Sequence, residues 1–273
     1  VLANYIHNKI QVEENGGIVY DTVFEQNIKT SRDGIFVNLE GAHNTLKENS
    51  FYVKQLFKIA KRHRFQPDTS RYTSLIDRLN PGNISHSILF SRFTYLYEHP
   101  VSDNNGFYRQ TFDSASPTYD STYIYKIENK LSWTNADNAK PQFLTFNFAL
   151  RHLYIENSVD SVKTIYNQLI PTGEVNFRVS DNIRLHFFGD FVTGNSYVGD
   201  FNLIGKVNLK TGLGELSYEL QNANLEPGRF YQAYESNHFR WLNEFKKQYF
   251  LINKFKYNLG SLSAWVNLFA IEN

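Results

Sequence analysis

The sequence predicts an all-β fold, an antiparallel up-and-down transmembrane β-barrel with a polar lumen and at least about 14 strands. Three observations favour this class. Apolar and polar residues alternate along many segments, as they do on a strand with one apolar and one wet face. Several of these segments reach about ten residues, which a tilted strand needs to cross a bilayer. Aromatic residues stand at the ends of the apolar faces.

The segment 121–134 shows all three features. Its odd positions carry the apolar face, Tyr123, Tyr125, Ile127, Leu131 and Trp133. Its even positions carry the polar face, Lys126, Glu128, Lys130, Ser132 and Thr134. Only Ile124 and Asn129 break the rule. Because Tyr and Trp favour lipid–water boundaries, rings at both ends of the apolar face predict a strand that spans the apolar layer.

Other strands are expected, in chain order, at 1–12, 18–28, 35–46, 51–64, 83–97, 143–156, 163–180, 183–191, 201–210, 216–221 and 237–246, with two more after them. Turn residues separate these segments, among them Asp33-Gly34, the polar stretch 47–50 and Thr211-Gly212. Pro171 and Gly173 predict a bulge or kink within 163–180, because proline cannot donate to a ladder. In 83–97 both faces are mixed, so the pattern does not decide which one points outward.

Connection lengths give a test that does not depend on hydrophobicity. Outer-membrane barrels have short turns at one end and long loops at the other, and successive connections alternate between the ends. The short connections form one class, 31–34, 135–140, 181–182, 211–212 and 247–248. The long ones, 98–120 and 223–236, fall in the other class. The segment 66–82 is an exception, since it is long where a short turn is expected.

Composition narrows the classes of protein. Lys plus Arg number 28 against 27 Asp plus Glu, so no basic excess indicates a nucleic-acid partner. Aromatic residues make up 16% of the chain, which favours strands. Cys is absent, which excludes a disulfide framework and a thiolate metal site. The lack of Met and the start at Val1 predict a processed or partial chain, with 1–273 a single barrel domain incomplete at one or both ends.

A water-soluble barrel or sandwich is the alternative fold. Its strands also alternate, but their apolar faces point into a core. Long strands with aromatic ends favour the membrane barrel, because a sandwich has no need of either feature. Charges of both signs in mid-strand fit a wet lumen.

The polar faces supply candidate pore-lining residues: Lys126, Glu128, Lys130, Arg151, Arg178, Arg184, Asp190, Lys206, Glu219, Arg240 and Glu244. The ends of the apolar faces supply candidate members of an aromatic girdle: Tyr123, Tyr125, Trp133, Tyr154, Phe239 and Trp241. No catalytic motif is present, and the eight His are scattered, so neither an enzyme, a metal site nor a cofactor is expected.

Two segments resemble the "putative porin" family of Bacteroidota outer membranes. Asp120-Ser121-Thr122 precede a strand that ends in 129–133, Asn-Lys-Leu-Ser-Trp, and Asn237-His238-Phe239 follow a loop that contains proline. The resemblance in the succession of strands and turns covers most of the chain. The resemblance in residue identity is limited to these short segments. It implies a polar barrel in the bacterial outer membrane and carries over no catalytic motif. The chain departs from the family pattern in lacking a recognisable start and a terminal strand that ends in an aromatic residue.

Two functions remain open. The first is passive diffusion of small hydrated solutes, with weak ion selectivity set by the mixed lumen charges. The second is a structural barrel with a plugged lumen, acting as a subunit of a larger envelope complex. The expected partners are outer-membrane lipid in both cases and, for the second, other outer-membrane or periplasmic proteins.

Overall fold

The structure, a computed structural model, describes residues 1–20, 25–27, 31, 34–59, 82–101, 106–112, 117–136, 142–159 and 162–272. The elements in these ranges are β1 (Leu2–Glu14), β2 (Ala42–Lys58), β3 (Asn83–His99), β4 (Thr118–Thr134), β5 (Leu144–Val159), β6 (Val162–Arg178), β7 (Ile183–Phe191), β8 (Thr193–Gly194), β9 (Phe201–Thr211), β10 (Gly214–Leu225), α3 (Arg229–Gln232), β11 (Ala233–Glu235), β12 (Arg240–Leu242), β13 (Gln248–Leu259) and β14 (Leu262–Glu272).

Eleven of these strands form one antiparallel meander in the order β1-β2-β3-β4-β5-β6-β7-β9-β10-β13-β14. The short β8 pairs with β6 beside this path, and β11 pairs with β12 in a separate ribbon. The all-β antiparallel prediction is confirmed. No pairing joins β1 to β14 in the part of the chain that the structure describes, so the described sheet is an open antiparallel wall, an arrangement consistent with the predicted transmembrane barrel.

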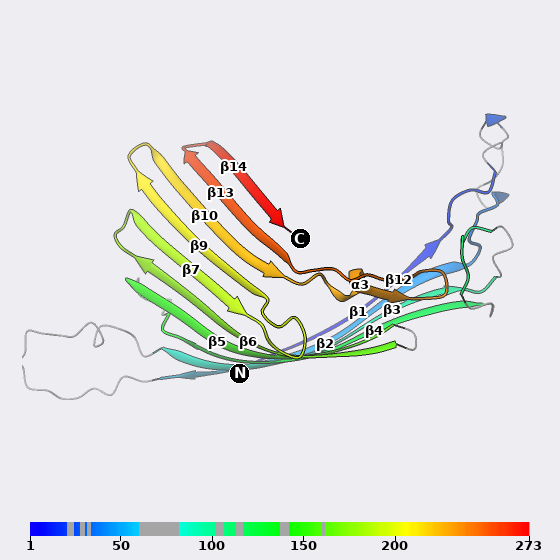
Figure 1. Cartoon of the computed structure of the whole chain (residues 1–273), viewed down its shortest axis with the longest axis horizontal. Coiled ribbons are helices and arrows are strands. Elements are labelled where there is room, and N and C mark those ends of the chain that lie inside the picture. Colours follow the sequence, from blue (N-terminus) through cyan, green and yellow to red (C-terminus); the bar gives the residue numbers. More distant parts are fainter. Residues whose placement is uncertain are drawn as a thin grey trace, which may run out of the picture.

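Strand length is set by pairing with neighbours. β3, β4 and β6 have 17 residues each, and β7 has nine. A tilted strand crosses a bilayer with about 9–11 residues, so the longest strands extend well past that thickness. Figure 1 shows the long sheet curving around α3 and β12, which lie within the curve.

The register defines two faces of the sheet. Residues that pair directly across antiparallel strands point to the same side. Lys126 pairs with Ser91 on β3 and with Ile155 on β5, and this row continues from strand to strand. We call the side of the sheet that carries Lys126 and Glu128 the inner face, and the side that carries Leu131 and Trp133 the outer face. On β3 the inner face is therefore the one with the serines, which the sequence alone left undecided.

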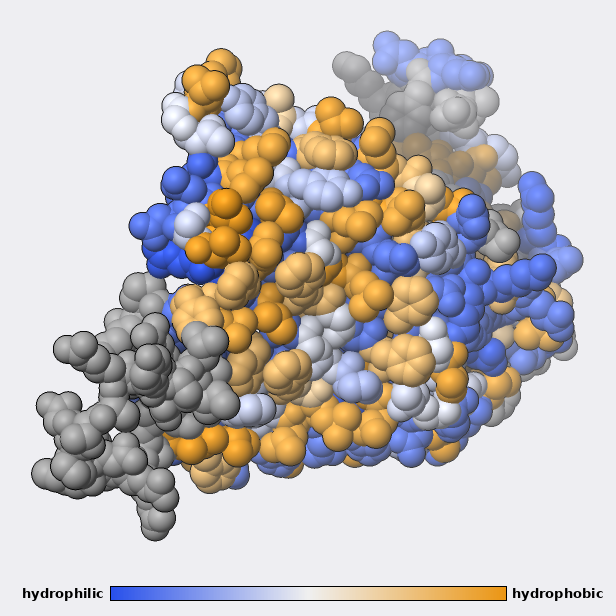
Figure 2. Space-filling model, turned by 60° about the vertical axis from the view of Figure 1, so that its left-hand side comes forward, coloured by the Kyte–Doolittle hydropathy of each residue, from blue (hydrophilic) through white to orange (hydrophobic). Residues whose placement is uncertain are grey.

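The apolar side chains of the outer face are exposed. Leu131, Phe148 and Phe187 are 53%, 46% and 53% exposed, respectively. Figure 2 shows apolar side chains predominating over much of one face of the molecule. Few apolar residues are buried among the described ones, and they are Leu39, Ala42, Ala149, Leu153, Tyr166, Ile170 and Ala223. A soluble sandwich needs the apolar faces in a core, so it does not fit the described sheet.

Several predicted boundaries are wrong near the N-terminus. The segments 35–46 and 51–64 were expected to be two strands with a turn at 47–50, but β2 runs through that polar stretch without interruption. Long-range pairing decides the conformation, because Glu48 stands opposite both Asn8 and Phe93. The expected strand at 18–28 is also absent from the described residues, where Ile18 makes only an isolated bridge to Val37.

The bulge or kink expected at Pro171 does not interrupt the pairing of β6 with β5. β6 continues through it, and Pro171 pairs in register with Leu150 of β5. On its other edge β6 pairs with β7 from Thr172 onward and with β8 at Gln168 and Leu169. Proline thus occupies the gap between these two pairings, where no ladder hydrogen bond is required of it.

The connections divide between two ends of the sheet. One end carries the short turns 135–143, 179–182, 212–213 and 260–261, together with the long connection 59–82, most of which lies outside the described residues. The other end carries 15–41, 100–117, 160–161, 192–200 and 226–247. Two expectations are wrong. Gly34 N donates to Ser31 O at 3.0 Å, but this turn lies inside a long connection instead of joining two strands, and 247–248 is not a turn between strands.

Candidate functional site: the inner face and the connection that covers it

Most of the predicted pore-lining residues share one surface. By register the inner face carries Lys126, Glu128, Lys130, Arg151, Arg178, Arg184, Asp190, Lys206 and Glu219. Neighbouring strands lie about 4.8 Å apart, so these side chains form rows across the sheet. Tyr123, Tyr125, Trp133 and Tyr154 lie on the outer face.

Four predicted residues lie elsewhere. Only 240–242 of the expected strand at 237–246 is a strand, and it pairs with β11 instead of joining the long sheet. Arg240 and Glu244 are therefore not part of the wall. Phe239 and Trp241 belong to the same connection and do not take girdle positions on the outer face. Their alternating pattern is a real strand signal, but it serves a short ribbon laid over the inner face.

The first charged group on the inner face centres on Glu128. Its carboxylate lies 3.5 Å from Lys126 Nζ and 3.3 Å from Arg151 Nη2, and its side chain is 17% exposed. Lys130 pairs in register with Arg151, which adds a further cation beside the group. Lys126 and Arg151 therefore flank the Glu128 carboxylate, Lys130 stands next to Arg151, and the Asp190 carboxyl also interacts with Arg151.

The second group runs across four strands. His186 pairs in register with Lys206, Lys206 with Glu219, and Glu219 with Lys254. The Glu219 carboxylate lies 2.8 Å from Lys254 Nζ and 3.8 Å from Lys206 Nζ. His186 Nε2 also lies 3.4 Å from Glu174. Lys206 and Lys254 therefore share the Glu219 carboxylate, and His186 lies beside the Glu174 carboxylate.

These partly exposed pairs add little to folding stability. Such pairs typically contribute about 0.2–1 kcal/mol each. Their larger effect is on the electric field along the face. Lys254, Glu174 and His186 were not among the residues predicted from the sequence as pore-lining. Polar alternation in 248–259 is the signal that would have found Lys254.

The connection between β10 and β13, residues 226–247, lies against the inner face, and we call it the inserted connection (Figure 1). The amide N of Asn237 donates to Asp120 Oδ1 at 2.8 Å. His238 is 7% exposed, and its ring stacks on Tyr108 with centroids 3.6 Å apart and planes 5° apart. These contacts fix the tip of the inserted connection to the start of β4 and to the β3–β4 connection.

The hydrogen bonds of His238 also define its tautomer. Nδ1 lies 3.1 Å from the carbonyl oxygen of Gln110, which can only accept, so Nδ1 carries the hydrogen. Nε2 then accepts from the Thr118 hydroxyl at 3.0 Å. Both ring nitrogens have hydrogen-bond partners, and the ring holds two elements together.

Asp200 holds the two ends of the inserted connection together. One carboxylate oxygen accepts from the amide N of Glu226 at 3.0 Å, and the other lies 2.8 Å from Lys247 Nζ. Asp200 is 5% exposed. Because residues 226 and 247 begin and end the inserted connection, one buried carboxylate brings its ends together at the sheet.

The β7–β9 connection, residues 192–200, covers a neighbouring part of the inner face. The Gln168 side chain of β6 donates to the carbonyl oxygen of Ser196 at 3.2 Å. The Tyr197 ring lies 5.5 Å from that of Tyr166. Burial raises the pKa of Tyr197 above its usual value, so its phenol is neutral at physiological pH.

Replacing His238 with alanine is expected to loosen the tip of the inserted connection. The change removes two hydrogen bonds and a ring contact, a loss of about 1–3 kcal/mol. Trypsin should then cut faster after Arg240 and Lys246. Phe245, which is 51% exposed, supplies the control Phe245→Ala. Equal cleavage rates in the parent and in His238→Ala would contradict this anchoring.

Across the described ranges no group of three or more His, Asp or Glu residues is arranged to hold a metal ion. No helix in those ranges is long and apolar enough to span a membrane.

An antiparallel meander with an exposed apolar outer face and a charged inner face is the architecture of an outer-membrane barrel wall. The chain belongs to the family described as "Putative porin", whose model matches residues 1–273, the whole chain. The family resemblance predicted from the sequence is thus confirmed. A porin family and an all-β fold point to an outer-membrane protein of bacteria. No curated protein and no solved structure matches the chain.

Proposed function

We propose that residues 1–273 form one outer-membrane barrel domain through which small hydrated solutes diffuse passively. The observation that carries the proposal is the charged inner face set against an exposed apolar outer face. Lipid satisfies the outer face, and water solvates the charges of the inner face. The family assignment supports the same role.

The charge pattern supports weak selectivity. On the wall, six predicted pore-lining cations, Lys126, Lys130, Arg151, Arg178, Arg184 and Lys206, accompany three anions, Glu128, Asp190 and Glu219. Mixed signs let a solute of either charge find a counter-charge, and the excess of cations in this set gives a small preference for anions. The inserted connection occupies part of the lumen and limits the size of solutes that pass.

The proposal is tested with the purified full chain in planar bilayers. It expects stepwise conductance in KCl, and a bilayer that stays sealed at all voltages would overturn it. The reversal potential across a KCl gradient then reports ion selectivity.

Replacing Glu219 with lysine is expected to shift that selectivity toward anions by about severalfold in permeability ratio. The change leaves Lys206 and Lys254 without their shared counter-charge. Glu40→Lys gives the same change in net charge at an exposed position in the β1–β2 connection and should leave the reversal potential unchanged. A shift of equal size in both variants would refute the role of the inner-face row.

A second function is favoured by the firm attachment of the inserted connection. Anchored at Asp200 and at His238, it would serve as a plug in a structural barrel that binds other outer-membrane or periplasmic proteins. Purification in mild detergent separates the two functions. A stable stoichiometric complex without conductance favours the scaffold, and conductance of the isolated chain favours the channel.

A further inference from the structure

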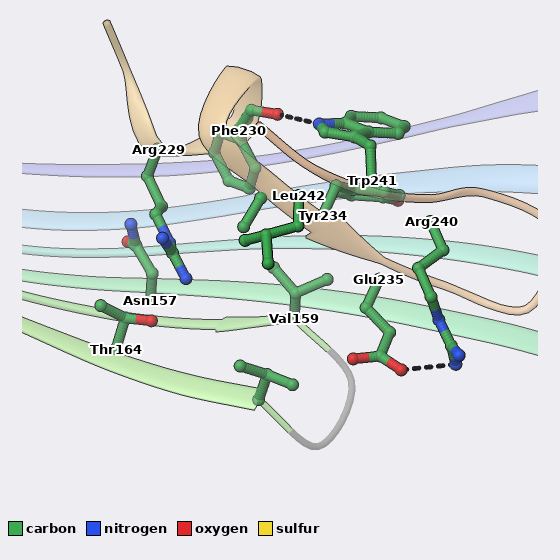
Figure 3. Close-up of a pocket in the computed structure, with 12 residues that line it drawn as sticks. Asn157, Val159, Thr164, Arg229, Phe230, Tyr234, Glu235, Arg240, Trp241 and Leu242 are labelled. Carbon is green, nitrogen blue, oxygen red and sulfur yellow. Dashed lines mark hydrogen bonds and ion pairs between the residues drawn. The ribbon is translucent and has the colours of Figure 1, made fainter. Parts of the chain in front are cut away.

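A cavity of 350 Å³ lies between the inserted connection and the ends of β5 and β6. Figure 3 shows its two sides, with α3, β11 and β12 above and the β5–β6 strand ends below. The volume lies near the lower limit of about 300–1,000 Å³ for small-molecule sites. The cavity sits at the end of the sheet that carries most of the long connections, where solutes enter in an outer-membrane barrel.

Among the described residues, two polar groups in this lining are unpaired: the carboxamide oxygen of Asn157 has no hydrogen bond and the guanidinium of Arg229 has no ion pair. The Oδ1 atom of Asn157 is buried and accepts no hydrogen bond. Arg229 makes no ion pair in the described part of the chain, and Figure 3 shows its guanidinium extending from α3 toward Asn157 and Thr164. A buried acceptor without a donor costs about 1–3 kcal/mol. Asn157 lines the cavity, so a turn of its carboxamide brings the oxygen to the cavity surface, where a ligand that supplies the donor recovers that cost.

Most of the other lining residues are apolar or form an ion pair with each other. Val159, Val162, Phe230 and Leu242 supply the apolar surface. Arg240 is neutralised by Glu235, whose carboxylate lies 2.5 Å away. Arg229 is therefore the uncompensated charge among the described lining residues.

We propose that this cavity binds a small organic carboxylate that has an apolar body and a hydroxyl group. The carboxylate pairs with Arg229, the hydroxyl donates to Asn157 Oδ1, and the body lies against Val159, Phe230 and Leu242. An arginine matches a carboxylate because its parallel N–H groups meet both oxygens. This inference names the solute class of the proposed channel and rests on that function for its biological role, although the binding itself does not.

The test uses the full chain in detergent micelles and 3-phenyllactate as the probe, with binding measured by titration calorimetry. Two analogues dissect the recognition, since 3-phenylpropionate lacks the hydroxyl and methyl 3-phenyllactate lacks the charge. Each is expected to bind about tenfold more weakly than 3-phenyllactate. Equal affinity of the ester and the acid would overturn the assignment to Arg229.

Variants of the chain give the complementary test. Arg229→Gln is expected to weaken 3-phenyllactate about tenfold and to remove the difference between acid and ester. Asn157→Val is expected to remove the difference between 3-phenyllactate and 3-phenylpropionate, with thermal unfolding confirming that it folds. Arg109→Gln removes one cation from the exposed β3–β4 connection and should bind like the parent. Equal weakening in Arg109→Gln and Arg229→Gln would overturn the proposal.

The binding experiment and the conductance experiment test the two proposals separately. A protein that conducts KCl but shows no heat of binding with 3-phenyllactate overturns the cavity assignment and leaves the channel intact. A protein that binds 3-phenyllactate with the expected analogue pattern but does not conduct overturns the channel and supports the cavity assignment.

Discussion

Replacing Phe187 with arginine is expected to destabilise the protein in a bilayer by about 2–4 kcal/mol, the cost of a cation on the lipid face near the midplane. Phe187 lies in the middle of the nine-residue β7, on the outer face, and is 53% exposed. It pairs with Val175 on β6 and Gly205 on β9, so no outer-face counter-charge stands directly beside it. The free energy of unfolding is measured by urea titration of the protein in phospholipid vesicles.

The neighbouring residue supplies a matched control. Phe188 is also a phenylalanine of β7, but it lies on the inner face and pairs in register with Glu174. Phe188→Arg places the new cation in water beside a carboxylate, and its cost should stay below about 1 kcal/mol. Equal costs at the two positions, or a larger cost at Phe188, would reverse the assignment of the faces and remove the basis for a channel.

The two faces and most of the wall could be predicted from the sequence because the direction of a strand side chain is a local property with a period of two residues. The segment 183–191 corresponds to β7, 201–210 to β9 within one residue, and 121–134 to the greater part of β4. Nine of the eleven predicted pore-lining residues lie on the inner face for the same reason.

The inserted connection could not be predicted because the contacts that place it are remote in sequence. Asn237 meets Asp120, which lies 117 residues earlier, and Lys247 meets Asp200. Alternation in 237–246 predicts a strand, of which only 240–242 forms, and it does not state which strand that segment pairs with. The same limit explains β2, where pairing with β1 and β3 carries the strand through the polar stretch at 47–50.

Shortening the inserted connection is expected to raise the single-channel conductance by roughly twofold or more, because a segment that occupies the lumen is removed. The variant replaces residues 227–246 with Asn-Gly. Leu225 and Gln248 pair directly, so a two-residue type I′ turn beyond Glu226 and Lys247 can join the strands. Retaining Glu226 and Lys247 preserves the contacts of Asp200, which would otherwise become a buried carboxylate without partners.

A second variant separates the bulk of the inserted connection from its anchoring. It replaces residues 227–246 with a Gly-Ser segment of equal length, which keeps the chain but removes the contacts of Asn237 and His238. Because an unanchored segment moves in and out of the lumen, this variant should show current fluctuations between the parent level and the level of the shortened variant. If the shortened variant folds and conducts no more than the parent, the inserted connection does not restrict the channel. If instead the parent is closed and the shortened variant conducts, the inserted connection is a plug and the scaffold function is favoured.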